Sequence, residues 1–299
     1  MIALALWGPL AAFGSSCTWA FASARYAQAS RDVGSARVNL ARAIVVVPIY
    51  LTFTAFRLGA HFTDGVTVRG SGWLLGSVLC SYAIADNLFF TAARRIGIST
   101  ALSIASTYPL WAALVGAFYG ERFGPLRAAA TLLCVFGVVA LVRLAPDRKI
   151  DAAGTGHKDT WGIVLAFITS ILWAGNSVSI KHGAVGLDVF QANAIRYLMA
   201  LVLLGAQVLL SRTPPPQPRP VRGWASLLPA IIADAFFGSV FYVYGLSHTD
   251  LSVGAPLSSQ APLLSVPIAI LMGEERWSPA RFLAVTVTVT GVVVLIVGG

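Results

Sequence analysis

Four charged side chains lie inside otherwise apolar stretches of this sequence: Arg42, Asp86, Arg196 and Asp234. If these stretches cross a membrane, each buried charge costs roughly 2.5–3.5 kcal/mol on insertion scales, so it should face a partner or a water-filled cavity. Their depths along the expected helices would allow Arg42 to pair with Asp86, and Arg196 with Asp234. One interpretation is that Asp86 or Asp234 binds a proton in one conformation and releases it in another, so that the four residues serve coupling or gating. The alternative is two structural ion pairs, or arginines that extend towards the helix ends.

Two prolines, Pro109 and Pro262, fall in the middle of apolar stretches where polar side chains gather. A proline inside a helix leaves the carbonyl four residues earlier without its usual N–H donor. In lipid that carbonyl must meet protein, water or a ligand. The polar residues next to the prolines are Ser106, Tyr108, Ser259 and Gln260. These positions could line a cavity that hydrogen-bonds a small polar ligand, or the hydroxyls could bond back to their own kinked helices.

Three aromatic residues, Trp19, Tyr82 and Trp173, could stack on a planar or cationic ligand in such a cavity, although membrane aromatics often serve packing or interface anchoring. The three cysteines and four histidines of the chain show no metal-ligand spacing. The sequence shows neither a phosphate-binding glycine loop nor a nucleophile beside a base. We therefore expect no metal, no cofactor and no enzymatic activity.

The stretches that must position these residues are apolar enough for a membrane. Hydrophobic residues make up 57% of the 299 residues and charged residues only 11%, more apolar sequence than a soluble core can use. Apolar runs between polar breaks predict helices at about residues 3–23, 38–56, 73–93, 98–119, 126–143, 161–181, 189–210, 224–246, 252–272 and 280–298. We predict an all-α integral membrane protein with ten transmembrane helices, held in the lipid bilayer of the plasma (inner) membrane. The net charge of +9 is spread over short loops without a basic face, so no nucleic-acid partner is expected.

The second half of the sequence repeats the first. Trp19 corresponds to Trp173, and Asn39-Leu40-Ala41-Arg42 corresponds to Asn193-Ala194-Ile195-Arg196, both at an offset of 154 residues. Because each half holds an odd number of predicted helices, the second half should lie upside down relative to the first. We predict two inverted five-helix repeats at 1–144 and 161–299, joined by a polar linker at 145–160. A monomer could carry out the function.

Two such repeats, each with a proline-containing helix, a Gly-Glu pair and a proline-started helix, resemble the drug/metabolite transporter superfamily, and specifically EamA-type transporters. The resemblance is carried by residues 101–121 and their counterpart 252–275, together with Trp19 and Trp173. It implies a ten-helix fold with a central cavity, and export of small metabolites or toxic compounds. It also implies cytoplasmic chain termini, whereas the distribution of lysine and arginine over the loops favours termini outside.

From the residues and the resemblance together we predict a secondary transporter. It would export a small organic metabolite or drug, amino acid-like or an aromatic or amine compound, by alternating access, with proton coupling as an option. The alternative is a flippase or exchanger for a phosphorylated or nucleotide-linked sugar, whose anion Arg42 and Arg196 would bind. A purely structural membrane protein would leave the buried Asp86 and Asp234 unexplained. Whether these two carboxylates face one cavity separates a transport role from a structural one.

Overall fold

The computed structural model describes residues 2–96, 101, 104–144, 159–211, 221–261, 263–264 and 278–298, which form helices joined by turns and short loops. The first half contains α1 (Ile2–Val33), α2 (Ser35–Leu58), η1 (Gly59–His61), α3 (Val68–Val78), η2 (Leu79–Ala83), α4 (Ala85–Ile96), α6 (Tyr108–Phe118) and α7 (Pro125–Leu144). The second half contains α8 (Thr160–Gly183), α9 (Val189–Leu210), α10 (Val221–Ala225), α11 (Leu228–Ala230), η3 (Ile231–Gly238), α12 (Ser239–Ser247), α13 (Leu251–Ser258) and α15 (Pro279–Gly298).

The predicted fold class is confirmed: within the described ranges the chain is all-α, and each of the ten predicted stretches contains helix. Five helical stretches are long and apolar enough to cross a membrane: Ser35–His61, Val68–Ala93, Thr160–Gly183, Val189–Leu210 and Gly223–Ser247. Shorter apolar helices accompany them. The protein is therefore a multi-pass membrane protein.

The first helix is longer than predicted. It continues past the apolar stretch to Val33, and the chain then reverses at a single residue, Gly34, to begin α2. Gly34 has a φ of 87°, a conformation that glycine adopts without the steric cost that a side chain would add. This tight turn holds the end of α1 beside the start of α2.

Two of the predicted helices change their winding partway along. The stretch expected at 73–93 contains the π-helical segment η2, and the stretch expected at 224–246 contains the π-helical segment η3. At the repeat offset of 154 residues, η2 corresponds to residues 233–237, which lie inside η3. A π turn fits one extra residue into a helix and is frequent at functional sites.

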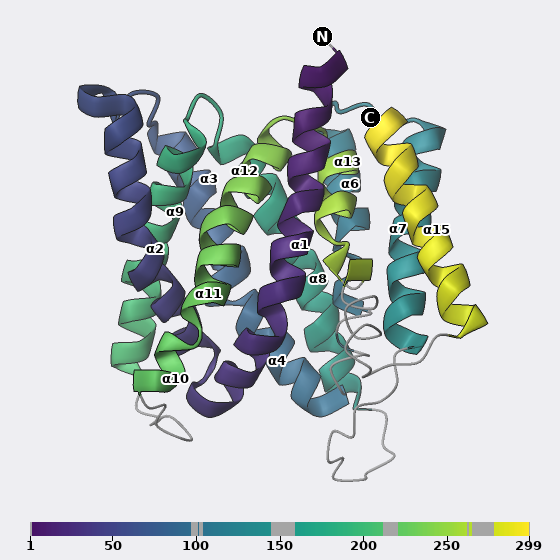
Figure 1. The fold of residues 1–299 in the computed structure, drawn as a ribbon, viewed down its shortest axis with the longest axis horizontal. Coiled ribbons are helices and arrows are strands. Elements are labelled where there is room, and N and C mark those ends of the chain that lie inside the picture. Colours follow the sequence, from purple (N-terminus) through teal and green to yellow (C-terminus); the bar gives the residue numbers. More distant parts are fainter. Residues whose placement is uncertain are drawn as a thin grey trace.

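The central helices bring the two halves of the chain together (Figure 1). In that view α2 and α9 pack together at one side of the bundle, and α7 and α15 pack together at the opposite side. Between these pairs α1 of the first half packs on η3 and α12 of the second, while α8 of the second half packs on α3 and α4 of the first. The N- and C-terminal ends lie at the same end of the bundle, which we call the terminal face.

Candidate functional site

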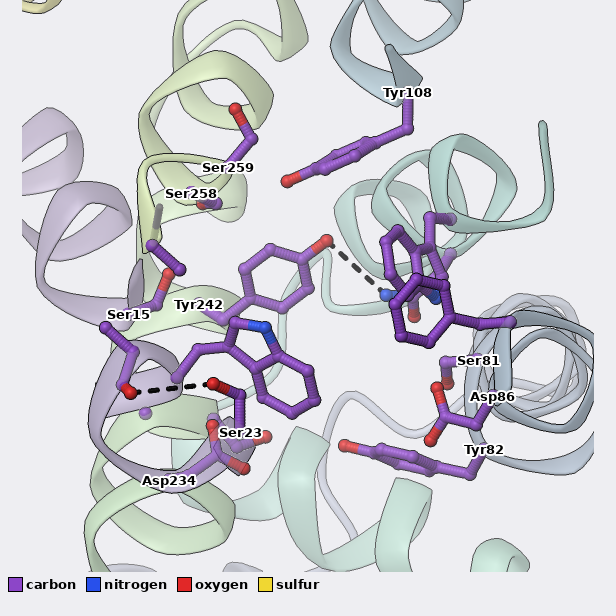
Figure 2. Close-up of a pocket in the computed structure, with 18 of the residues that line it drawn as sticks. Ser15, Ser23, Ser81, Tyr82, Asp86, Tyr108, Asp234, Tyr242, Ser258 and Ser259 are labelled. Atoms are coloured by element: carbon purple, nitrogen blue, oxygen red, sulfur yellow. Dashed lines mark hydrogen bonds between the residues drawn. The ribbon is translucent and has the colours of Figure 1, made fainter. Parts of the chain in front are cut away.

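A cavity of about 360 Å³ lies among the central helices, and both halves of the chain contribute to its wall. Six of the residues predicted for a cavity line it: Trp19, Tyr82, Ser106, Tyr108, Trp173 and Ser259. Arg42, Asp86 and Asp234 line it as well, so the two carboxylates face one common cavity. Figure 2 shows Asp234 and Asp86 on opposite sides of that cavity.

Three other predicted positions, all described, do not line the cavity. Pro109 and Gln260 are buried outside its wall, and the Nε2 atom of Gln260 donates a hydrogen bond of 2.7 Å to the carbonyl of Pro256. Arg196 is buried behind the wall. Pro262 lies outside the described residues.

Pro109 stands at the start of a helix, so the expectation of a continuous helix through it is wrong. Ser106 and Thr107 form a turn, α6 begins at Tyr108, and Pro109 occupies the first helical turn. A proline lacks the N–H that would continue the preceding helix, yet it fits the first turn, where no such bond is needed. The break places Tyr108 at the cavity, where its hydroxyl donates to the carbonyl of Ala255, 3.1 Å away on α13.

The buried charges pair across the two halves of the chain. The Nη2 atom of Arg42 lies 2.8 Å from Oδ2 of Asp234, and the two side chains are only 6% and 9% exposed. The guanidinium also lies 4.6 Å from the centre of the Tyr26 ring. The expected pairs, Arg42 with Asp86 and Arg196 with Asp234, are therefore wrong. Similar depth permits several pairings, and the packing of α2 against η3 selects this one.

Asp86 has no cationic partner within 4.0 Å in the part of the chain that the structure describes. Its Oδ2 atom accepts a hydrogen bond of 2.7 Å from Nδ2 of Asn39. The other end of the same amide, Oδ1, accepts a 2.9 Å bond from Nη1 of Arg42. A continuous polar chain, Asp234–Arg42–Asn39–Asp86, thus joins the two carboxylates, and one of them has an ionic partner while the other has an amide.

The second half repeats the Asn-x-x-Arg arrangement without the acids. Nη1 of Arg196 donates to Oδ1 of Asn193 over 3.2 Å, as Arg42 does to Asn39. The Nε atom of Arg196 donates to the hydroxyl of Ser77 over 2.9 Å, and no carboxylate of a described residue lies within 4.0 Å. The two repeats therefore share a polar frame, but only the frame around Arg42 carries ionisable acids.

Three serine hydroxyls of the cavity wall donate their protons to backbone carbonyls. Ser15 donates to the carbonyl of Ala12 over 2.7 Å, and Ser81 donates to that of Ser77 over 2.7 Å. Ser259 donates to its own helix in the same way, over 2.8 Å. Because a hydroxyl has one proton, these oxygens offer only lone pairs to a bound molecule.

Polar contacts join the two halves at the terminal face. The carboxylate of Glu121, in the loop before α7, accepts a 2.6 Å bond from the backbone N–H of Leu251 at the start of α13, and lies 2.7 Å from Nζ of Lys181 on α8. Arg127 of α7 forms an ion pair with Asp250. We call these residues the terminal seal. An apolar cluster from α8, α9, α12 and α13 packs on the cavity side of it: Val178, Ile180, Ala184, Ala192, Val243, Leu246 and Leu251.

Sequence analysis missed several residues of the wall, chiefly small hydroxyls. They are Ser15, Ser23, Ser81, Asn176, Tyr197 and Ser239. A helical spacing of four residues could have found some of them, since Ser15, Trp19 and Ser23 share one face of α1. Tyr82 and Asp86 are also four residues apart, one near the end of η2 and the other near the start of α4.

The chain is similar to known proteins over most of its length. The sequence pattern of the EamA-like transporter family matches residues 6–143 and 160–297. A protein of Archaeoglobus fulgidus described as an uncharacterized transporter is 26% identical over 190 residues, which are 62% of this chain and 63% of that protein. The chain thus spans less than two thirds of that relative's length.

Two further similarities are more limited. The transmembrane protein 234 homolog of Anopheles gambiae is 24% identical over 151 residues, 50% of this chain and 94% of that protein. A solved structure named "Crystal structure of protein" superposes with a TM-score of 0.76 at 20% identity, covering 96% of this chain and 95% of that chain. At this identity the structural match shows a shared fold.

Proposed function

The chain belongs to the EamA-like transporter family, and from that premise we propose that it is a secondary transporter that exports a small organic solute by alternating access. The observation that carries the proposal is one cavity, lined by both halves, into which both buried carboxylates face. Its volume of about 360 Å³ falls in the range of small-molecule sites. The direction, export, rests on the family resemblance.

Alternating access requires that the cavity open to one side at a time. The terminal seal and the apolar cluster next to it support a state in which the cavity is closed towards the terminal face. In this proposal the two halves move relative to each other, and the bonds of Glu121 to Lys181 and Leu251 break when the cavity opens there. The contacts that would break all join one half to the other, as such a movement requires.

We further propose that Asp86 couples this movement to proton entry. Asp234 is held by Arg42, whereas the carboxylate of Asp86 lines the cavity and accepts hydrogen bonds from the neutral side chains of Asn39 and Trp173. The charged groups near Asp86 are Arg42 on α2 and Asp234 on η3. A proton on Asp86 would remove the unpaired charge and let the site close without solute, so the solute and the proton would alternate at one carboxylate.

The sugar-phosphate alternative has less support. The two Nη atoms of Arg42 bind Asn39 and Asp234 and its Nε atom is buried, while Arg196 stands outside the cavity wall. A phosphate group would need at least one guanidinium that is free to bind it.

The test compares the small molecules that accumulate in the medium of cells producing the intact protein with those from cells producing Asp86→Asn at equal membrane abundance. We expect at least one organic compound to be enriched only by the intact protein. That compound is then loaded into proteoliposomes, where a proton gradient should drive its movement through the intact protein only. Equal media from both cell lines for every compound would refute export, and gradient-driven movement through Asp86→Asn would refute the coupling role.

A further inference from the structure

The ionisable groups that a ligand can reach in the cavity do not balance. Among the described residues, the wall holds one guanidinium, that of Arg42, and two carboxylates, those of Asp86 and Asp234. Arg42 is bonded to Asp234 at 2.8 Å, which leaves the charge of Asp86 without a cation. The nearby Arg196 does not compensate at the wall, because neutral oxygens hold it behind the ring of Tyr82, 5.9 Å from the ring centre. A ligand therefore meets one excess negative charge.

Four hydroxyls of the wall favour the same kind of ligand. Ser15, Ser81, Ser259 and Tyr108 have given their hydroxyl protons to backbone carbonyls, so each presents an acceptor. A molecule with N–H donors can bond to such oxygens, whereas a carboxylate or phosphate would face lone pairs. Charge and hydrogen-bonding capacity thus point to a cationic donor.

The remaining surface is aromatic. Five aromatic side chains line one part of the cavity, and we call them the aromatic wall: Trp19, Tyr82, Phe89, Phe90 and Trp173. Phe89 packs on Trp173 with 5.3 Å between ring centres, and Tyr82 lies one helical turn before Asp86. Ring faces attract cations and stack on planar ring systems. Figure 2 shows Tyr82 beside the carboxylate of Asp86.

We propose that the cavity takes a protonated aromatic amine, with its ammonium group at Asp86 and its ring system against the aromatic wall. This assignment names the substrate class of the transporter proposed above and rests on that proposal. A zwitterion such as an amino acid fits less well, because its carboxylate would find no free cation among the described residues of the wall. An anion fits worst, since it would lie near an unpaired carboxylate.

The test uses four labelled indole compounds that share one ring and differ in charge. They are tryptamine (a cation), tryptophol (neutral), tryptophan (a zwitterion) and indole-3-acetate (an anion), and each is bound at equilibrium to the purified protein in lipid nanodiscs. We expect tryptamine to bind at least about tenfold more tightly than tryptophan or indole-3-acetate, because like charges across a binding surface are strongly disfavoured. Equal or tighter binding of either of those two compounds, or no binding of tryptamine, would overturn the proposal.

Substitutions at one position then locate the charge. Asp86→Asn should weaken tryptamine binding at least about tenfold and leave tryptophol binding unchanged, since the neutral compound has no ammonium group. Asp86→Glu should retain most of the preference for tryptamine. Unchanged tryptamine binding to Asp86→Asn would show that the preference arises elsewhere, against the proposal. The four indole compounds are also compared on the unmodified protein, so the proposal can still be tested if a variant misfolds.

Transport measurements separate this proposal from the one on which it rests. Tryptamine that binds selectively but does not move into or out of proteoliposomes would support the substrate class and refute transport of it. Tryptophan that moves as readily as tryptamine would support transport and refute the amine assignment.

Discussion

Replacing Asp86 and Asp234 by asparagine, one at a time, should separate a coupling carboxylate from a structural one. Asp234→Asn leaves the guanidinium of Arg42 without its partner at 2.8 Å, in a place where both side chains are less than a tenth exposed. Removing one member of a buried ion pair costs about 3–5 kcal/mol. That loss corresponds to a folding equilibrium shifted by roughly two to more than three powers of ten.

Asp86→Asn should cost much less. The Asp86 carboxylate accepts hydrogen bonds from the side chains of Asn39 and Trp173, and the oxygen of an asparagine side chain can accept such bonds. Since no cation loses a partner, we expect a change in unfolding free energy of about 1 kcal/mol or less. The substitution should nevertheless abolish proton-driven transport, if Asp86 is the coupling site.

The assay pairs two measurements on each variant: unfolding in mixed micelles of detergent and dodecyl sulfate, and gradient-driven transport in proteoliposomes. The double variant Arg42→Met with Asp234→Asn serves as control, because it removes both charges and should regain most of the stability that Asp234→Asn loses. A double variant no more stable than Asp234→Asn would refute the ion pair. Equal destabilisation by the two asparagine substitutions would refute the distinction between the carboxylates.

Two further predictions concern the seal and the helix packing. Glu121→Gln removes the charge that holds Lys181 on α8 and weakens the cap of α13. A cysteine introduced at Ser259 should then react faster with a membrane-impermeant thiol reagent added at the terminal face. An unchanged reaction rate would argue against the seal as a gate. Gly137→Ala should destabilise the protein by about 1–3 kcal/mol, because the added methyl would lie 2.9 Å from a backbone nitrogen of α15. The control Gly205→Ala should be tolerated, because no atom lies within 4 Å of the methyl group added there. Equal unfolding curves for the two alanine variants would refute this account of the packing between α7 and α15.

Sequence reasoning predicted the helices well because their signals are local. The stretch 189–210 coincides with α9, and α7 and α15 begin at the prolines expected to start them. The prediction failed where a helix changes its winding or breaks. Hydropathy does not distinguish a π turn from an α turn, and a proline inside an apolar run can begin a helix as well as kink one.

The candidate site was predicted by residue type more than by geometry. Buried charge alone pointed to Arg42, Asp86, Arg196 and Asp234, and all of these except Arg196 line the cavity. Their partners could not be predicted, because a sequence gives the depth of a side chain in a membrane helix but not which neighbouring helix it faces. The small hydroxyls of the wall, such as Ser81, carry no distinguishing signal beyond helical spacing.

The π-helical segments at matching places in the two repeats have a mechanical consequence. Each residue added to or removed from a helix turns everything beyond it by about 100° around the axis, since one α turn contains 3.6 residues. If the extra residue of η2 were absorbed into an ordinary α turn, Asp86 just beyond it would rotate about the helix axis and away from the cavity. A one-residue deletion within Leu79–Ala83 should therefore leave α4 helical but protect a cysteine at position 86 from reagents that enter the cavity. Undiminished labelling of that cysteine would show that the position of the carboxylate does not depend on this turn. The side of the cavity that carries Asp86 would then switch between two positions that differ by one residue of helix winding.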